Sequence, residues 1–235
     1  MDTNKNEPSI VFDQERASSY DEKFAKLAPM KDALHLLMRL VFSELPADSR
    51  VLCVGVGTGA ELIYLAQAFP QWQFTAVEPA TAMLDICRQR ADECGIASRC
   101  SFHEAYLDSL PASVPFDAAT CILVSQFIMH LEDRQRFFRK LTEHLRPGGY
   151  LVNADLASDI SGSTYNSLFE IWLRGWKYTG IPAEEVENLR ASLGRDVAVL
   201  PPQEIESIIT SSGFETPVLF FQTLLIHAWY AKLAS

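Results

Sequence analysis

The chain has 235 residues, of which 48% are hydrophobic, so it is long enough to bury a full core within one domain. Its 30 acidic residues outnumber its 20 basic ones, and the formal charge of −10 argues against a broad phosphate-binding surface and against nucleic acid as a partner. The five cysteines form no CxxC pair and have no histidine-rich neighbour, so neither a zinc site nor a redox dithiol is predicted.

The first 47 residues are predicted to form a helical entry segment, with helices at 18–28 and 30–45, in front of a main domain at 48–235. The opening residues contain no apolar signal core. The most apolar run, 218–231, is interrupted by polar residues and is too short to span a bilayer. We therefore expect a cytoplasmic protein without a membrane partner.

From residue 48 to residue 155, short β-rich runs alternate with helical stretches. Strands that are apolar on both faces and separated by helices indicate a doubly wound, parallel α/β sheet. The predicted strands are 50–56, 73–78, 99–105, 116–123 and 150–156, and the helices between them are 61–69, 81–94 and 133–145.

The rest of the chain begins with a helical insertion at about 160–195 and a helix at 203–213. Two β-rich runs follow at 216–222 and 223–233, joined with almost no loop. They must pair antiparallel, because a parallel neighbour needs a crossover of a dozen or more residues.

The stretch VLCVGVGTGAEL, residues 51–62, places three glycines between a strand and a helix. Glycine lets backbone approach a ligand closely, and the helix that follows offers free N–H groups. A P-loop is disfavoured, because Ala60 and Glu61 stand where its Lys-Ser/Thr pair is needed. A turn that only packs strand against helix is the structural alternative.

The dinucleotide fingerprint GxGxxG/A is satisfied by Gly55, Gly57 and Ala60. Glu78 lies about 20 residues further on, where a carboxylate can accept hydrogen bonds from ribose hydroxyls. The turn taken alone therefore leaves NAD open as a cofactor.

These stretches resemble the motifs of the class I S-adenosylmethionine (SAM) dependent methyltransferases, in order over about residues 48–155. The resemblance implies a Rossmann-like, seven-stranded sheet, mostly parallel, that ends in an antiparallel hairpin. NAD enzymes of the open parallel type do not imply that ending. The matching stretches are VLCVGVGTG, FTAVEPATAMLDICRQR, SFHEAYLDSLP, FDAATCILVSQFIMHLED and LRPGGYLVNADL.

The resemblance further implies SAM as the cofactor and S-adenosylhomocysteine as its product. The glycines would lie under the methionine part of SAM, Glu78 would bind the ribose, and Met83 would pack near the adenine. Val54 stands where many relatives carry an acidic residue before the first glycine, so that contact is absent. The implied cofactor-binding set is Tyr20, Gly55, Val56, Gly57, Gly59, Glu78, Pro79, Met83, Glu104, Ala105 and Ser125.

Two members of this set have simple structural alternatives. Tyr20 resembles a tyrosine that closes over the carboxylate of the cofactor, but it could equally be a surface aromatic residue. Ser125 could contact the cofactor or cap the next helix.

Methyl transfer mainly requires alignment of the nucleophile, the carbon and the sulfur, so this family has no universal catalytic residue. Gln126, His130 and Asp155 are the polar residues at the carboxyl ends of the fourth and fifth predicted strands, where open α/β sheets form their crevice. His130 is a candidate general base, although its position also suits a helix entrance. Asp155 is a candidate base or substrate anchor.

The insertion carries an aromatic stripe at helical spacing, for which a core or subunit contact is the favoured interpretation and a lid over an apolar or planar acceptor the alternative. Arg174 and Lys177 lie off the stripe and could bind an anionic substrate or be solvated. The stripe consists of Tyr165, Phe169, Trp172 and Trp176.

The leading hypothesis is a SAM-dependent methyltransferase acting on a small molecule, with a homodimer left open. The alternative is an enzyme similar to carboxy-SAM synthase, which the opening VFDQ and the late GFE and FFQ stretches resemble. That activity needs a cation for the extra carboxylate, which the sequence does not place. A non-catalytic SAM-binding module and an NAD oxidoreductase are the remaining classes.

Overall fold

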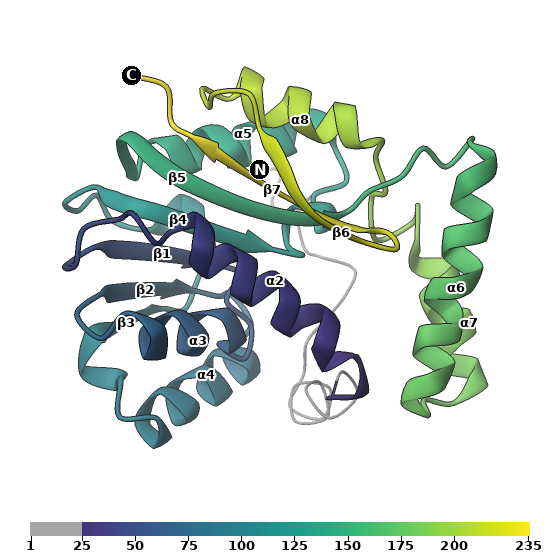
Figure 1. The fold of residues 1–235 in the computed structure, drawn as a ribbon, viewed down its shortest axis with the longest axis horizontal. Coiled ribbons are helices and arrows are strands. Elements are labelled where there is room, and N and C mark those ends of the chain that lie inside the picture. Colours follow the sequence, from purple (N-terminus) through teal and green to yellow (C-terminus); the bar gives the residue numbers. More distant parts are fainter. Residues whose placement is uncertain (1–24) are drawn as a thin grey trace, which may run out of the picture.

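The computed structural model describes residues 25–235, which form one seven-stranded sheet in the order β3-β2-β1-β4-β5-β7-β6 (Figure 1). Strands β3, β2, β1, β4 and β5 run parallel, whereas β7 pairs antiparallel with both β5 and β6. This confirms the predicted mostly parallel sheet. The strands are β1 (Arg50–Val54), β2 (Gln73–Val77), β3 (Cys100–His103), β4 (Phe116–Ile122), β5 (Leu145–Leu156), β6 (Val218–Thr223) and β7 (Ile226–Lys232).

The C-terminal hairpin has the two-residue turn that its sequence implied. Strand β6 ends at Thr223 and β7 begins at Ile226, so only Leu224 and Leu225 connect them. A connection of this length permits only antiparallel pairing, and β7 consequently lies between β5 and β6.

Helices cover both faces of the sheet. Figure 1 shows α2, α3 and α4 on one face, α5 and α8 on the other, and α6 with α7 beyond the carboxyl ends of the parallel strands. In the described part of the chain, no helix is both long and apolar enough to cross a membrane. The helices are α2 (Ala28–Val41), α3 (Ala60–Ala68), α4 (Thr81–Glu93), α5 (Leu131–Thr142), α6 (Ser163–Thr179), α7 (Ala183–Ser192) and α8 (Pro202–Ser211), with a short 3-10 turn η1 (Ala25–Leu27) before α2.

Strand β1 shows why the central strands of this sheet are rich in apolar residues. Leu52 and Val54 pack in the core cluster that also contains residues of α5 and α8, whereas Val51 and Cys53 pack in the cluster of α2, α3 and α4. Successive strand residues point to opposite faces, so a strand covered on both sides must be apolar at every position.

Most elements differ from their predicted bounds by a few residues, and β5 and α5 are two examples. Strand β5 begins at Leu145 rather than at 150, because the Pro-Gly-Gly stretch stays extended and bulges against β4. A side chain at Gly149 would place its Cβ 2.8 Å from the carbonyl oxygen of Arg146, so only glycine fits there. Helix α5 begins at Leu131 and ends at Thr142 instead of spanning 133–145.

The entry segment is described only in part. The second predicted helix corresponds to α2, and its Met38, together with Phe42 just after its end, is completely buried in the main core. The first predicted helix lies largely outside the described residues, as does Tyr20. The domain boundary at 47/48 stays a prediction.

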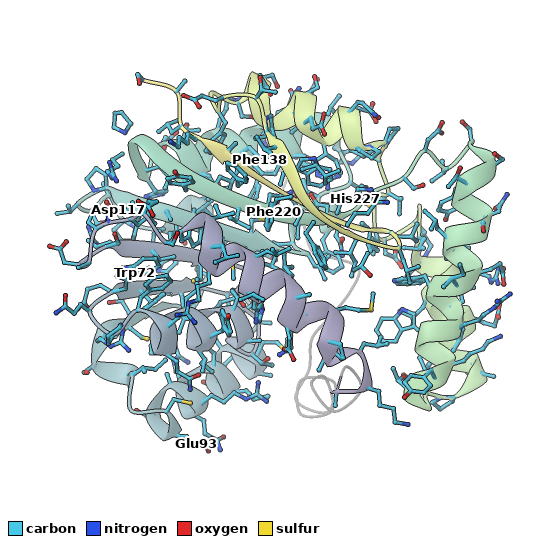
Figure 2. All side chains as sticks on the ribbon, viewed as in Figure 1. Trp72, Glu93, Asp117, Phe138, Phe220 and His227 are labelled. Carbon is cyan, nitrogen blue, oxygen red and sulfur yellow. The ribbon has the colours of Figure 1, made fainter. Side chains whose placement is uncertain are left out.

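Phe138, labelled in Figure 2, is completely buried between α5 and the sheet, whereas the adjacent Phe137 is only half-buried. Phe138→Ala should lower the free energy of unfolding by about 3 to 5 kcal/mol, because it leaves a cavity in the core. Phe137→Ala should cost clearly less. Urea unfolding of both variants measures the difference, and equal losses would contradict the packing described for α5.

Candidate functional site

The glycine turn joins β1 to α3 at the carboxyl edge of the sheet. Gly55 and Gly59 both have positive φ angles, of 64° and 86°. A Cβ on Gly55 would lie 2.4 Å from the side chain of Val124, and one on Gly59 would lie 2.6 Å from Sγ of Cys87. These two glycines are therefore required by the packing of the turn itself, as the structural alternative proposed.

Gly57 is different, because no residue in the described part of the chain crowds it. Its φ is also positive, at 54°, but the nearest atom to an added Cβ is the terminal methyl of Met83, at 3.4 Å. Gly57 is only half-buried. The turn thus presents open backbone at Gly57, which is where a ligand can approach.

Glu78 follows β2, next to the turn, and is 8% exposed. The backbone N–H groups of Gly57 and Ala80 each donate a hydrogen bond of 3.0 Å to one of its two carboxylate oxygens. Burial raises the pKa of Glu78, and the two N–H donors act against that rise. Each oxygen keeps a lone pair, so the carboxylate can still accept hydrogen bonds from a diol.

The predicted adenine contacts are only partly brought together. Met83 is buried in the first turn of α4 beside Gly57. Glu104 is exposed, and its carboxylate accepts hydrogen bonds from Thr81 Oγ1 (2.7 Å) and Arg88 Nη1 (3.0 Å). These bonds hold the pKa of Glu104 below its usual range.

The other members of the set contribute little side chain to a pocket. The side chain of Val56 packs in the core, Pro79 is exposed and Ala105 is half-buried. Any contact from Val56 must therefore come from its backbone.

A buried polar cluster lies at the carboxyl ends of β4 and β5. Ser125 begins a 3-10 turn after β4 (Ser125–Phe127) and donates a hydrogen bond of 2.7 Å to Oδ2 of Asp155. Asn153 donates to the same oxygen at 2.8 Å, and Nε of Arg134 donates to the Ser125 hydroxyl at 3.1 Å. Nη2 of Arg134 lies 3.1 Å from Oδ2 of Asp155, an ion pair without the angle of a hydrogen bond.

This cluster bears directly on the predicted roles of Ser125 and Asp155. Asp155 is 0% exposed and paired with a guanidinium that is 1% exposed. Such a carboxylate has no surface with which to meet a substrate, so its burial disfavours the catalytic hypothesis. Ser125 is likewise buried and links α5 to β5.

Arg134 was not singled out from the sequence, although a signal was present. It shares one face of α5 with the core residues Phe138 and Leu141, at spacings of four and three. A cation at an apolar helix position is rarely buried without a partner, so the pattern predicted an acidic residue facing Arg134 from a neighbouring element.

The two other predicted polar residues lie at the same edge. Gln126 is buried, and its side-chain oxygen accepts a hydrogen bond of 2.9 Å from the backbone N–H of Leu156. His130 is exposed and occupies the N-cap position of α5 without forming a side-chain cap. The helix-entrance interpretation of His130 therefore holds for its position, and its role as a base stays a hypothesis.

The aromatic stripe of α6 belongs to a small core of its own. Phe169, Trp172 and Trp176 are buried, and they pack with Val186 of α7 and with residues at the ends of β5 and β7. Arg174 and Lys177 are exposed on the other side of the helix, as are most charged residues. The stripe thus holds the α6–α7 pair together and against the sheet.

The entry segment touches this pair. Leu27 lies beside Gly175, and Lys26 donates a hydrogen bond of 3.4 Å to the backbone oxygen of Tyr178. The start of α2 and the insertion therefore meet beyond the carboxyl edge of the sheet (Figure 1).

A glycine turn after β1 and a carboxylate after β2, at the carboxyl edge of an open α/β sheet, define a nucleotide-cofactor site. A methyltransferase domain family matches residues 51–149. The chain is 27% identical over 229 residues to demethylmenaquinone methyltransferase from Deinococcus radiodurans, covering 91% of this chain and 92% of the relative. It is 26% identical over 212 residues to carboxy-S-adenosyl-L-methionine synthase from Campylobacter lari, covering 89% and 88%.

Among solved structures, an O-methyltransferase family 2 protein from Planctomyces limnophilus, in complex with apigenin, matches with a TM-score of 0.62 and 18% identity. The match covers 93% of this chain and 62% of that protein, and at this identity it supports the fold. Together these findings support a class I SAM-dependent methyltransferase, with SAM as its cofactor.

The described residues fit that cofactor. Gly57 leaves open backbone, Glu78 can accept hydrogen bonds from both ribose hydroxyls, and the first turn of α3 presents N–H groups for an anionic group. The individual contacts remain predictions.

Gly57→Ala and Gly59→Ala separate ligand contact from packing. Gly57→Ala should cost about 1 to 2 kcal/mol of stability for its positive φ, and should weaken SAM binding at least about tenfold by filling the open side of the turn. Gly59→Ala should destabilise the fold more, because its Cβ meets Cys87. Thermal unfolding and calorimetric titration with SAM test both, and wild-type affinity of Gly57→Ala would refute its place in the site.

Asp155→Asn should lower the free energy of unfolding by about 3 to 5 kcal/mol, because it leaves the buried charge of Arg134 without a counter-charge. The double variant Arg134→Met, Asp155→Leu should recover most of that loss. Denaturant unfolding measures both effects. A single variant that keeps its stability but loses turnover would restore Asp155 as a catalytic residue.

Proposed function

We propose that this methyltransferase transfers the methyl group of SAM to a small-molecule acceptor bound at the carboxyl edge of the sheet, beneath α6 and α7. The position of this helix pair carries the proposal, since it stands beyond the strand ends that hold the cofactor residues (Figure 1). Half-buried apolar side chains line its base, among them Phe127, Leu168 and Leu224. Such a lining suits an apolar or planar acceptor.

SAM supplies an electrophilic methyl group, so the chain's own task is to bind, align and exclude water. Alignment can contribute on the order of 7 to 11 kcal/mol to lowering the barrier. The buried Ser125–Asp155–Arg134 cluster contributes by fixing the backbone after β4, opposite the glycine turn. Val124 lies against Gly55, so the segment after β4 packs directly on the glycine turn.

A general base is needed only if the acceptor atom carries a proton at neutral pH. His130 is the candidate, because it is exposed and follows the turn at the end of β4.

All five cysteines are free thiols, which supports a cytoplasmic location.

A second candidate is a carboxy-SAM synthase-like reaction, favoured by the similarity to the Campylobacter lari enzyme over most of both chains. The additional carboxylate of its product would need a cation. The guanidinium of Arg134 reaches the end of β4, but Asp155 already neutralises it. The geometry therefore supports this candidate less than methyl transfer to a separate acceptor.

The two candidates differ in their products. The purified protein is incubated with SAM and panels of phenols, carboxylic acids and quinone precursors, and S-adenosylhomocysteine is measured by mass spectrometry. Acceptor-dependent formation of S-adenosylhomocysteine, lost in Glu78→Ala, is the expected result. Carboxylated SAM bound to the purified protein, with no acceptor methylated, would favour the second candidate.

His130→Ala should leave SAM affinity unchanged and lower kcat roughly 100-fold or more with an acceptor that must lose a proton. Leu131→Ala, at the next and equally exposed position, should leave both quantities unchanged. Steady-state kinetics with calorimetric titration of SAM provides the comparison. Unchanged kcat in His130→Ala would remove the general base from the mechanism.

A further inference from the structure

Glu61 is a buried carboxyl group that the cofactor assignment does not yet use. It is the second residue of α3, two positions after Gly59, the last glycine of the turn. Its exposed fraction is 7%. Within residues 25–235, no other side chain forms a hydrogen bond or an ion pair with its carboxyl group, which accepts a hydrogen bond from the backbone N–H of Glu61 itself. A carboxyl group buried in this way carries a cost unless a partner arrives.

The surroundings of Glu61 disfavour its charge. Burial is the main cause that raises its pKa to about 8; a hydrogen bond from its own backbone N–H acts against that rise, and the nearby charge of Glu78 adds to it. Lys31 acts in the opposite direction, but its ammonium lies 3.4 Å from Asp32, on an exposed part of α2. Glu61 is therefore mostly protonated at neutral pH in the ligand-free protein.

His35 and the three cysteines around Glu61 stay neutral between the usual carboxyl pKa and about pH 8. Burial lowers the pKa of His35 to about 4, raises that of Cys87 to about 12, and raises those of Cys53 and Cys121 well above their usual value. The titratable groups around Glu61 are Lys31 and His35 on α2, Cys53 on β1, Cys121 on β4, Cys87 on α4 and Glu78 after β2.

SAM carries two positive groups, an α-ammonium and a sulfonium. The chain has Val54, and not an acidic residue, directly before the first glycine, so a counter-ion for these groups must come from another position. We propose that Glu61 is the counter-ion of the α-ammonium group of SAM, and that cofactor binding releases the proton of the Glu61 carboxyl group to solvent. The proposal rests on SAM being the cofactor and does not depend on the acceptor.

The ammonium is the chemically sensible partner. A carboxylate next to the sulfonium would stabilise the positive charge of the ground state, which is dispersed in the transition state, and would slow methyl transfer. It would also place a competing oxygen nucleophile beside the methyl group. The ammonium keeps its charge throughout the reaction, so an ion pair with it strengthens binding without this penalty.

The same group makes the stability of the free protein depend on pH. The folded state holds the Glu61 proton up to about pH 8, whereas the unfolded state releases it near the ordinary value of 4.5. Between these values the folded state binds more protons, so its free energy of unfolding falls as pH rises. Glu61→Gln should remove that part of the slope.

The experiment is calorimetric titration of the full chain at about pH 7, in buffers with different ionisation enthalpies, which counts protons released per ligand bound. The ligands are SAM, S-adenosylhomocysteine and methylthioadenosine. The first two share the ammonium, and only SAM has the sulfonium. We expect release of roughly one proton with SAM and with S-adenosylhomocysteine, and none with methylthioadenosine.

Glu61→Gln should abolish the release and weaken SAM and S-adenosylhomocysteine on the order of 10- to 100-fold, the worth of a hydrogen bond to a charged group. Its affinity for methylthioadenosine should be unchanged, which also shows that the variant is folded. Glu132→Gln is the matched control, since Glu132 is the second residue of α5 and is exposed. It should behave as the wild type with all three ligands.

SAM binding without proton release, or equal affinities of Glu61→Gln and the wild type, would overturn the inference and leave the methyltransferase assignment standing. Release with SAM alone would assign the carboxylate to the sulfonium, and release with methylthioadenosine would exclude the ammonium; either overturns the proposal. Failure of SAM to bind the wild type at all would instead overturn the cofactor assignment on which the inference rests.

Discussion

The structure of the cofactor edge depends on the hydrogen bond from the backbone N–H of Gly57 to Glu78. This bond ties the turn after β1 to the end of β2, and the N–H of Ala80 holds the other carboxylate oxygen. The turn can pack against Val124 and Cys87 only because Gly55 and Gly59 carry no side chain. The hydrogen bond and this packing together connect the ends of β1 and β2 with α4 and the segment after β4, and they leave Gly57 open.

Three buried carboxyl groups near this edge are distinguished by their partners. Asp155 is paired with Arg134 and holds the backbone after β4 in place. Glu78 is stabilised by two N–H donors and still has lone pairs for a ligand. Glu61 has no side-chain partner among the described residues and accepts only a hydrogen bond from its own backbone N–H, and burial raises its pKa to about 8. The three carboxyl groups therefore differ in their environments, and we assign a structural role to Asp155 and propose ligand-binding roles for Glu78 and Glu61.

We expect the insertion between β5 and α8 to determine which acceptor this chain selects. Its aromatic residues are used internally, to join α6 to α7 and to the sheet ends. In the proposed function, the acceptor would instead contact half-buried apolar side chains at the base of the pair, such as Leu168 and Leu224. Because one fold serves many reactions, the acceptor has to be argued from this surface rather than from the sheet.

Local pattern in the sequence determined the strands, the glycine turn and the hairpin, because two-face apolarity, positive φ at glycine and a two-residue loop each act within a few residues. It also placed Glu78, which needs only to follow β2. Only the tertiary structure decided that Asp155 meets Arg134, and that Glu61 is enclosed without a side-chain partner among residues 25–235. Those outcomes depend on side chains that are far apart in the sequence and on the water that packing removes from between them.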